Sequence, residues 1–350
     1  MFTYLRLLLL PFSLIYGLII LVRNKLYDWK VFKSTAFDLP VICVGNLVVG
    51  GSGKTPTTEY LVRLLSNYKV AILSRGYGRK TKGFVLADEK ATAATIGDEP
   101  MQYYKKFPKI TVAVCEDRVK GINLLKANHD VILLDDAYQH RAVKAGFTVL
   151  LFEFAKLKNF QFLLPAGNLR EPFSNYNRTN AVLITKSPSP VNIVDQIEIR
   201  RKIDLTLDQR LSFSSIKYGE LIHLFTNETK VNIGNNEIFL LTGIANPKPL
   251  VEYLSQFSSN IHSFEHPDHH DFTVQDIKVL IKAFNEHPAK EKIIITTEKD
   301  SQRLLGDNLK DLLLNLPIFY LPIEIELATK DKITFDQNIL DYVANTKRIG

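Results

Sequence analysis

One short stretch near the start of the chain constrains the fold more than any other feature. An apolar run, Val41–Val44, leads into a glycine-rich loop, and the residues after the loop have the pattern of a helix. Glycines let the backbone turn its N–H groups toward phosphate oxygens, and the N-terminus of the following helix adds partial positive charge. The sequence therefore predicts a phosphate-binding loop between a buried strand and a helix, formed by Gly50, Gly51, Ser52, Gly53, Lys54 and Thr55.

This loop departs from the common phosphate-binding pattern at one position. The pattern Gly-x-x-x-x-Gly-Lys-[Ser/Thr] would place a glycine at position 48, where this chain has Val48. The location of the loop between a strand and a helix still favours phosphate binding. We expect Lys54 to reach the β- and γ-phosphates of a nucleotide and the Thr55 hydroxyl to bind Mg²⁺.

A pair of acidic residues ends another apolar run. Asp135 and Asp136 directly follow Val131–Leu134. Carboxylates at the end of a buried strand hold Mg²⁺ in nucleotide sites, either directly or through water. Alternatively, the two residues only begin a turn, but adjacent carboxylates repel one another unless a cation lies close. We therefore expect Asp135 and Asp136 to belong to the metal site.

Short apolar runs alternate with helical patterns from residue 39 onward. Strands that are apolar throughout and are joined by helices indicate an α/β fold with a mostly parallel sheet covered on both faces. The first series of predicted strands is Val41–Val44, Val70–Ser74, Thr111–Cys115, Val131–Leu134, Thr148–Phe152 and Ala181–Thr185. A second series is Ile238–Gly243, Ile261–Phe264, Lys292–Thr296 and Phe319–Pro322. We predict an N-terminal segment at 1–35, a nucleotide-binding domain at 36–205, a linker at 206–236 and a smaller α/β domain at 237–350.

The N-terminal segment has the composition of a membrane-associated helix. Leu7–Val22 is nearly all apolar, and four basic residues lie between positions 23 and 33. The run is shorter than the roughly 20 residues of a spanning helix, and no small-residue cleavage site follows it. Aromatic residues lie near its ends, namely Phe2, Tyr4, Phe12, Tyr16 and Trp29. A helix lying in the membrane interface accounts for this pattern, and a core helix packed on the domain is the alternative.

Charge and cysteine content narrow the classes of partner and compartment. The chain has 44 Lys and Arg against 37 Asp and Glu, a net charge of +7. This surplus suits an anionic partner such as a nucleotide, a phospholipid surface or a phosphorylated substrate. No Lys/Arg run typical of a nucleic-acid-binding tail is present, so we expect no nucleic-acid partner. The two cysteines, Cys43 and Cys115, lie in predicted strands, which indicates a reducing compartment and excludes a disulfide framework.

Several further strings make the sequence resemble one known family. They are Ser74–Arg79 (SRGYGR), Gly97–Pro100 (GDEP), Asp135–Arg141 (DDAYQHR), Leu164–Pro172 (LPAGNLREP), Leu241–Pro247 (LTGIANP), Pro267–His270 (PDHH) and Thr296–Asp300 (TTEKD). In this order and spacing they resemble the tetraacyldisaccharide 4′-kinases of lipid A biosynthesis. Val48 is compatible with that family, whose loop resembles Gly-Asn-x-x-x-Gly-Gly-x-Gly-Lys-Thr. The resemblance implies transfer of the γ-phosphate of ATP, with Mg²⁺, to the 4′-hydroxyl of tetraacyldisaccharide 1-phosphate. It also implies a peripheral location at the cytoplasmic face of the inner membrane.

Two residues carry the catalytic roles that the resemblance implies. Asp98 matches the family's catalytic carboxylate, which would accept the proton of the sugar hydroxyl. His269 would be its partner, although His270 next to it is an alternative. From local sequence alone, Asp98 is better explained as the cap of a helix that begins at Pro100.

The resemblance places other residues near the same site. Glu99 would join Asp135 and Asp136 around Mg²⁺, and Tyr77 would contact the nucleotide or the substrate. Arg170 and Glu171 match a motif near the active site, where they would contact the substrate. Arg75 follows a predicted strand and would help to hold a phosphate or the substrate.

Two other functions remain open from the sequence. One is a GTPase or metal-insertion chaperone that acts as a switch. Guanine selection usually needs an [Asn/Thr]-Lys-x-Asp string, which this chain lacks, and a metal chaperone would be expected to carry a Cys-x-Cys or His-rich loop. The other is a membrane-associated scaffold that has lost the chemistry. The presence of Lys54, Thr55, Asp98, Asp135 and His269 argues against it.

Overall fold

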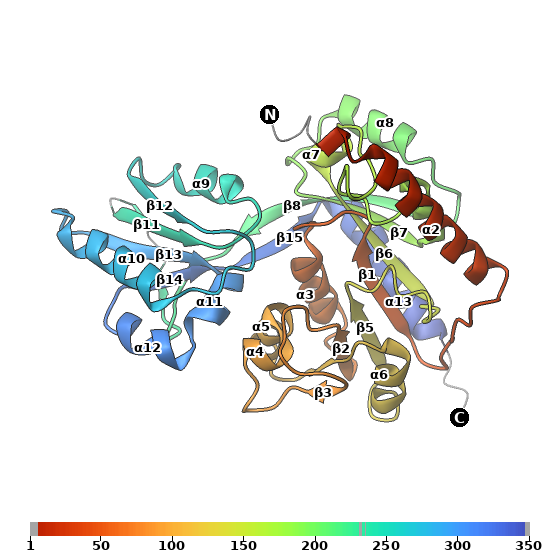
Figure 1. Cartoon of the computed structure of the whole chain (residues 1–350), viewed down its shortest axis with the longest axis horizontal. Helices are drawn as coiled ribbons and strands as arrows, with labels where there is room; N and C mark the ends of the chain where they lie inside the picture. The colour runs from red at the N-terminus through yellow and green to blue at the C-terminus, as the bar shows by residue number, and fades with distance from the viewer. Residues whose placement is uncertain (1–5, 231–232, 235, 347–350) are drawn as a thin grey trace.

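The chain forms two α/β units, one large and one small, as Figure 1 shows for the computed structural model. The structure describes residues 6–230, 233–234 and 236–346. The larger unit is built on a nine-stranded sheet and the smaller on a six-stranded sheet. The α/β class with a mostly parallel sheet and a second, smaller α/β unit is therefore confirmed.

The large sheet has the strand order β15-β8-β7-β6-β1-β5-β2-β4-β3. All strands from β8 to β4 in this order run parallel, and the edge strands β15 and β3 run antiparallel to their neighbours. The strands are β1 Val41–Asn46, β2 Val70–Ser74, β3 Val85–Leu86, β4 Thr111–Val114, β5 Val131–Asp135, β6 Phe147–Glu153, β7 Ala181–Thr185, β8 Arg210–Tyr218 and β15 Ile323–Leu327. Each predicted strand of the first series is confirmed to within two residues at either end.

Helices cover both faces of this sheet, which explains why its inner strands are apolar at every position. On one face, α3 and α13 pack against the side chains of Ile42, Val44 and Leu133. On the other face, α6 covers one half of the sheet and α8 the other. The helices of this unit are α3 Lys54–Leu64, α4 Ala93–Ile96, α5 Asp98–Lys106, α6 Arg118–Leu125, α7 Phe154–Leu157, the 3₁₀ helix η1 Phe173–Arg178, α8 Ile193–Lys202 and α13 Thr329–Asn345.

The small sheet has the order β10-β9-β14-β13-β11-β12, with β14, β13, β11 and β12 parallel. Its strands are β9 Leu221–His223, β10 Thr229–Lys230, β11 Glu237–Thr242, β12 Ile261–Glu265, β13 Lys292–Thr297 and β14 Ile318–Leu321. Its helices are α9 Lys248–Leu254, α10 Val274–Glu286, α11 Glu298–Leu304 and α12 Asp307–Leu313. The four strands predicted for the second series are confirmed.

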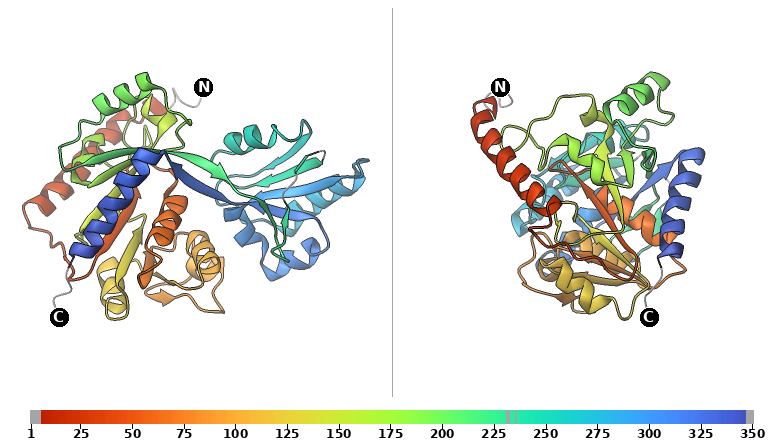
Figure 2. Two further views of the ribbon diagram at one scale, coloured as in Figure 1. Left: turned by 180° about the vertical axis from the view of Figure 1, so that it is seen from behind. Right: turned by 90° about the vertical axis from the view of Figure 1, so that its right-hand side faces the viewer.

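The predicted domain boundaries are wrong at two places. The stretch 206–236, predicted as a linker, contains β8, which pairs in parallel with β7 of the large sheet. The predicted C-terminal domain, 237–350, contains β15 and α13, which belong to the large unit. The chain leaves the large unit through β8 and returns through β15, and these antiparallel strands form the ribbon between the units in Figures 1 and 2. Residues 231–232, 235 and 347–350 of these predicted ranges lie outside the described residues.

The N-terminal helix α2, Leu10–Asp28, lies along the outside of the large unit (Figure 2). Its buried residues are Ser13, Ile20 and Asn24, whereas most of its apolar side chains are exposed. The alternative of a core helix is therefore wrong. With 19 residues and a mean hydropathy of 1.2, α2 is also long and apolar enough to cross a bilayer. Residues 1–5 of the predicted segment, with Phe2 and Tyr4, lie outside the described residues.

A buried cluster of charges joins the two units. Glu59 of α3 is fully buried, and its Oε2 lies 2.8 Å from Nζ of Lys106 on α5. The same ammonium lies 2.8 Å from Oε1 of Glu298 on α11 of the small unit. Burial raises the pKa of both carboxyl groups, and the single lysine between them offsets only part of that effect. Lys106 therefore holds together two carboxylates that would otherwise repel each other.

We expect Lys106→Met to lower the free energy of unfolding by about 3 kcal/mol at pH 7, because it removes the cation that bridges two buried carboxylates. Glu59 and Glu298 have folded-state pKa values above their unfolded values, so each destabilises the folded protein increasingly as the pH rises above the unfolded pKa. At pH 5 a larger share of both groups is protonated, and the stability difference between Lys106→Met and the wild type should be smaller than at pH 7. Urea denaturation at both pH values measures it. Lys105→Met at the neighbouring exposed position is the matched control, and equal stability of the two variants would contradict the prediction.

Candidate active site

The loop after β1 has the geometry of a phosphate-binding loop. Asn46, the last residue of β1, donates from Nδ2 to the carbonyl oxygen of Val48 (2.7 Å) and to Oγ of Ser52 (2.7 Å). Thr185 of β7 donates to the carbonyl oxygen of Ser52 (2.8 Å). Gly50 and Gly53 have φ of 106° and 84°, values that favour glycine, and α3 begins directly after Gly53. The loop is thus held open at the N-terminus of α3, where backbone N–H groups can bind an anion.

Lys54 and Arg170 both lie close to the carboxylate of Asp136. Nζ of Lys54 lies 3.8 Å from Oδ1 of Asp136, and Nη1 of Arg170 lies 3.1 Å from the same oxygen. Arg170 reaches this place because its segment runs along the loop, with the Arg170 N–H donating to the carbonyl oxygen of Leu47 (2.7 Å). Lys54, Asp136 and Arg170 therefore lie next to one another beside the loop.

The residues predicted to hold Mg²⁺ fit a divalent cation. Asp135 is buried at the end of β5; its Oδ2 accepts a hydrogen bond from Tyr103 of α5 (3.2 Å), and its Oδ1 is buried without a hydrogen-bond partner among the described residues. Burial, and after it the charge of Asp136, raises the pKa of Asp135 to about 7. Tyr103 also interacts with the Thr55 hydroxyl. Carboxylate and hydroxyl oxygens are the ligands that Mg²⁺ prefers, and a cation would use the unpartnered oxygen of Asp135.

The predicted pair of Asp98 and His269 is brought together from the two units. Nδ1 of His269 lies 3.3 Å from Oδ2 of Asp98, although the two residues are 171 positions apart. Asp98 begins α5 but makes no side-chain cap, so its explanation as a helix cap is wrong. His270 instead contacts Asp276 (2.9 Å), which leaves His269 as the partner of Asp98.

Two basic residues of α11 surround this pair, and neither received a role from the sequence. Arg303 donates to Oδ2 of Asp98 from Nε (2.9 Å) and from Nη2 (2.6 Å). Nζ of Lys299 donates to Nε2 of His269 (2.9 Å) and pairs with Oε1 of Glu99 (3.1 Å). Burial alone would raise the pKa of Asp98, but the hydrogen bonds from His269 and Arg303 hold it below its ordinary value. Lys299 lies in the Thr296–Asp300 string, the only sequence signal for either residue.

The site around Asp98 adjoins the phosphate-binding loop. Asp98 and Glu99 begin α5, whose Tyr103 contacts Asp135, and the charge of Glu99 acts on Asp135. The ring of Tyr77 packs edge-on against His269, with centroids 5.4 Å apart. Tyr77 therefore lies beside the pair of Asp98 and His269.

Of the predicted substrate residues, Glu171 is buried in ion pairs and hydrogen bonds, and Arg75 lies on the surface. Glu171 is fully buried, and Arg23, Asn24, Asn175 and Arg178 all donate to its carboxylate. The Glu171 carboxylate thus holds α2 on the large unit, and the prediction that it contacts substrate is wrong. Arg75 is exposed after β2 and makes no ion pair with any described residue, so its role stays a prediction.

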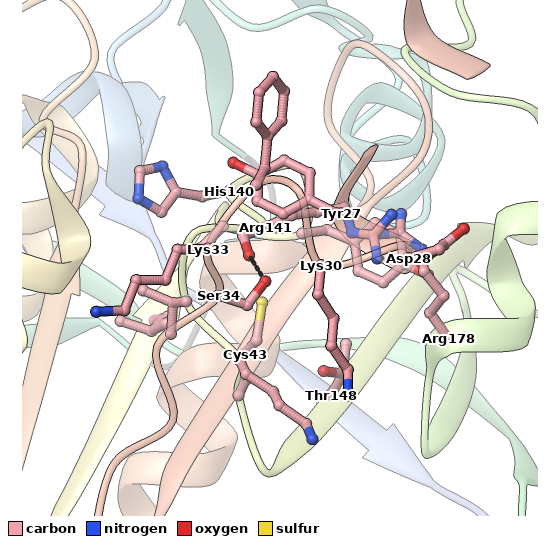
Figure 3. Close-up of a pocket in the computed structure, with 17 residues that line it drawn as sticks. Tyr27, Asp28, Lys30, Lys33, Ser34, Cys43, His140, Arg141, Thr148 and Arg178 are labelled. Atoms are coloured by element: carbon pink, nitrogen blue, oxygen red, sulfur yellow. Dashed lines mark hydrogen bonds and ion pairs between the residues drawn. The ribbon is translucent and has the colours of Figure 1, made fainter. Parts of the chain in front are cut away.

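A pocket of about 670 Å³ lies where α2 ends (Figure 3). Most of its lining comes from two stretches of the chain: Tyr27, Asp28, Lys30, Phe32, Lys33 and Ser34 at the end of α2 and after it, and residues of the segment 137–148 that follows β5. Five of its lining residues are cationic, namely Lys30, Lys33, Arg141, Lys144 and Arg178. Arg141 and Arg178 pair with Asp28 and Glu171, whereas the three lysines make no ion pair with a described residue. The pocket therefore has three lysine charges without a paired carboxylate among the described residues, next to the C-terminal end of α2.

Comparison with known proteins agrees with this site. The family model described as tetraacyldisaccharide-1-P 4′-kinase matches residues 5–344. The tetraacyldisaccharide 4′-kinase of Phocaeicola vulgatus is 45% identical, over 97% of this chain and 96% of its own length. That of Flavobacterium johnsoniae is 46% identical, over 97% of each chain.

A solved structure extends the similarity to the whole fold. The LpxK protein of Aquifex aeolicus, crystallised in complex with ATP, superimposes with a TM-score of 0.75 at 30% identity. The match covers 97% of this chain and 99% of that protein. The resemblance drawn from the sequence motifs is thereby confirmed, and the chain belongs to the tetraacyldisaccharide-1-P 4′-kinase family.

Proposed function

We propose that this chain transfers the γ-phosphate of ATP to the 4′-hydroxyl of tetraacyldisaccharide 1-phosphate, a lipid A precursor. The observation that carries the proposal is the Asp98–His269 pair beside a phosphate-binding loop, in a member of this family. A GTPase or metal-insertion chaperone would not explain why a histidine of the small unit contacts a carboxylate at this place.

Each part of the site has a chemical task in this reaction. The loop N–H groups, Lys54 and Arg170 bind the phosphates and offset their charge. Thr55, Asp135 and Asp136, bordered by Glu99, would hold Mg²⁺, which supplies further charge neutralisation at the transferred phosphoryl group. The ring of Tyr77 packs against His269, where it would contact the nucleotide or the sugar.

Asp98 acts on the acceptor. Its carboxylate takes the proton of the 4′-hydroxyl as the oxygen bonds to the γ-phosphorus, and the bond to the β-phosphate oxygen breaks to release ADP. His269 hydrogen-bonds the same carboxylate and so keeps it oriented toward the acceptor. The two units contribute one member each, so the site is complete only when they meet.

The direct test is transfer of radiolabelled γ-phosphate from ATP to tetraacyldisaccharide 1-phosphate in detergent, with Mg²⁺ or with EDTA. A Mg²⁺-dependent lipid product that carries a second phosphate supports the proposal. Release of free phosphate alone, or transfer only from GTP, would contradict it.

We further propose that α2 holds the protein peripherally at the cytoplasmic face of the inner membrane. The exposed apolar side chains of α2 include Leu14 and Leu18, with exposed fractions of 75% and 62%. The uncompensated lysines of the pocket at its end suit anionic lipid headgroups. Two features support the cytoplasmic side: the proposed use of ATP, and the two buried cysteines, which form no disulfide.

We expect Leu14→Glu combined with Leu18→Glu to lower partitioning onto anionic phospholipid vesicles at least about 10-fold, because each leucine loses roughly 1.5–3 kcal/mol of burial in lipid. Vesicle flotation measures the bound fraction, and ATP binding should stay unchanged. The matched control is Leu207→Glu with Ile333→Glu, two exposed apolar residues outside α2. Equal loss of binding in both double variants would contradict the anchor.

A further inference from the structure

The carboxylate of Asp98 is held almost entirely through one oxygen. Oδ2 accepts from Nε and Nη2 of Arg303 and from Nδ1 of His269, whereas no described residue donates to Oδ1. A carboxylate oxygen with three donors has little capacity left to accept a proton. Oδ1 is therefore the oxygen that can accept the proton of the sugar hydroxyl.

Arg303 is itself rigidly placed. Its side chain is 5% exposed, and Nη1 donates to Oδ1 of Asp300 (3.1 Å) and to the carbonyl oxygen of His270 (3.3 Å). Asp300 is fully buried, and its Oδ2 accepts from the Gly243 N–H (3.0 Å) and from the Thr297 hydroxyl (2.7 Å). The guanidinium is thus fixed to the framework of the small unit before it meets Asp98.

The histidine is oriented by the same helix. The Lys299 ammonium can only donate and lies 2.9 Å from Nε2 of His269, a closer approach than the 3.4 Å between Nη2 of Arg303 and Nδ1; with Nε2 as the acceptor, the ring proton is on Nδ1, facing Asp98. Lys299 and Arg303 lie four residues apart on α11, so they project from the same side of the helix. One helix of the small unit therefore orients both members of a pair whose carboxylate belongs to the large unit.

We infer that Arg303 is a positioning residue for phosphoryl transfer, which orients the Asp98 carboxylate so that Oδ1 faces the acceptor hydroxyl. The inference rests on the proposed kinase function. Arg303 touches no reacting atom; it acts through Asp98, and it makes the orientation of the base depend on contact between the two units. Its positive charge also keeps the carboxylate ionised when no acceptor is bound.

The test compares Arg303→Ala and Arg303→Lys in the lipid phosphorylation assay. We expect Arg303→Ala to lower kcat roughly 10–100-fold with the KM for ATP within about twofold, because a misplaced base costs turnover and not nucleotide binding. Arg303→Lys should retain more activity than Arg303→Ala. Guanidinium added to Arg303→Ala should restore part of the lost kcat, which a loss of folding alone would not allow.

The matched control is Arg200→Ala, which removes an exposed arginine of α8 that lies over the ring of Phe213, and it should respond neither in kcat nor to guanidinium. Two results would overturn the inference. One is a wild-type kcat in Arg303→Ala. The other is a loss of kcat that guanidinium does not restore and that is equally large in Arg303→Ala and in the control variant. If Arg303→Ala does not fold, Arg303→Lys decides: lowered kcat with unchanged KM supports the role, and wild-type kcat overturns it. An inactive wild-type protein in the same assay would instead refute the proposed function.

Discussion

Asp98→Asn is expected to lower turnover by about 10²–10⁴-fold, the range that a positioned general base contributes. Asparagine keeps the size of the side chain but cannot accept a proton. Its amide oxygen would turn toward the three donors on the Oδ2 side, which places the amide nitrogen where the acceptor hydroxyl should bind. Initial rates of lipid phosphorylation at saturating ATP measure the effect.

The matched control for this variant is Asp276→Asn. Asp276 also contacts a histidine, His270, in the small unit, but it belongs to the helix cap of α10 and not to the active site. It should keep turnover near the wild-type level, since the amide oxygen of asparagine can still accept from the Thr273 N–H (2.8 Å in the wild type). Near-wild-type turnover of Asp98→Asn would show that another group accepts the proton.

Lys54→Ala is expected to lower kcat at least about 10²-fold, as the loss of one preorganised charge at a reacting centre does. The ammonium lies at the start of α3 and 3.8 Å from Asp136. Without it, Asp136 and the incoming phosphates repel each other, so the KM for ATP should rise as well. Steady-state kinetics and nucleotide binding measured by thermal shift report the two effects separately.

Lys158→Ala is the matched control for Lys54, because Lys158 pairs with Asp195 on the surface (2.8 Å) and contacts no residue of the loop. It should leave kcat and KM unchanged. If Lys54→Ala retained most of its turnover, the loop would bind a ligand without taking part in transfer.

The strands and the phosphate-binding loop were predictable because their signals are local. A buried parallel strand is apolar at every position, and β2 and β7 were predicted with their observed ends. The loop combines residues that lie side by side in the chain. For Asp98, in contrast, local sequence favoured a helix cap, and only the family resemblance suggested catalysis.

The domain boundaries could not be predicted from the same local patterns. α13 has the pattern of one more helix in the second series, and nothing local shows that β15 returns to the large sheet before it. The buried role of Glu171 escaped prediction for a related reason, since its four donors come from α2 and from the η1 region. Such contacts depend on how distant segments pack.

The sequence by itself determined the α/β class, the phosphate-binding loop with Lys54 and Thr55, the acidic pair at the end of β5 and the apolar N-terminal helix. Each of these features follows from the pattern of apolar residues or from the spacing of residues that are neighbours in the chain. Only the tertiary structure decided which histidine meets Asp98, that Arg303 and Lys299 of α11 orient the pair, and where the two units divide. These features join residues up to 205 positions apart, and such pairings arise from the packing of the two units and not from local spacing.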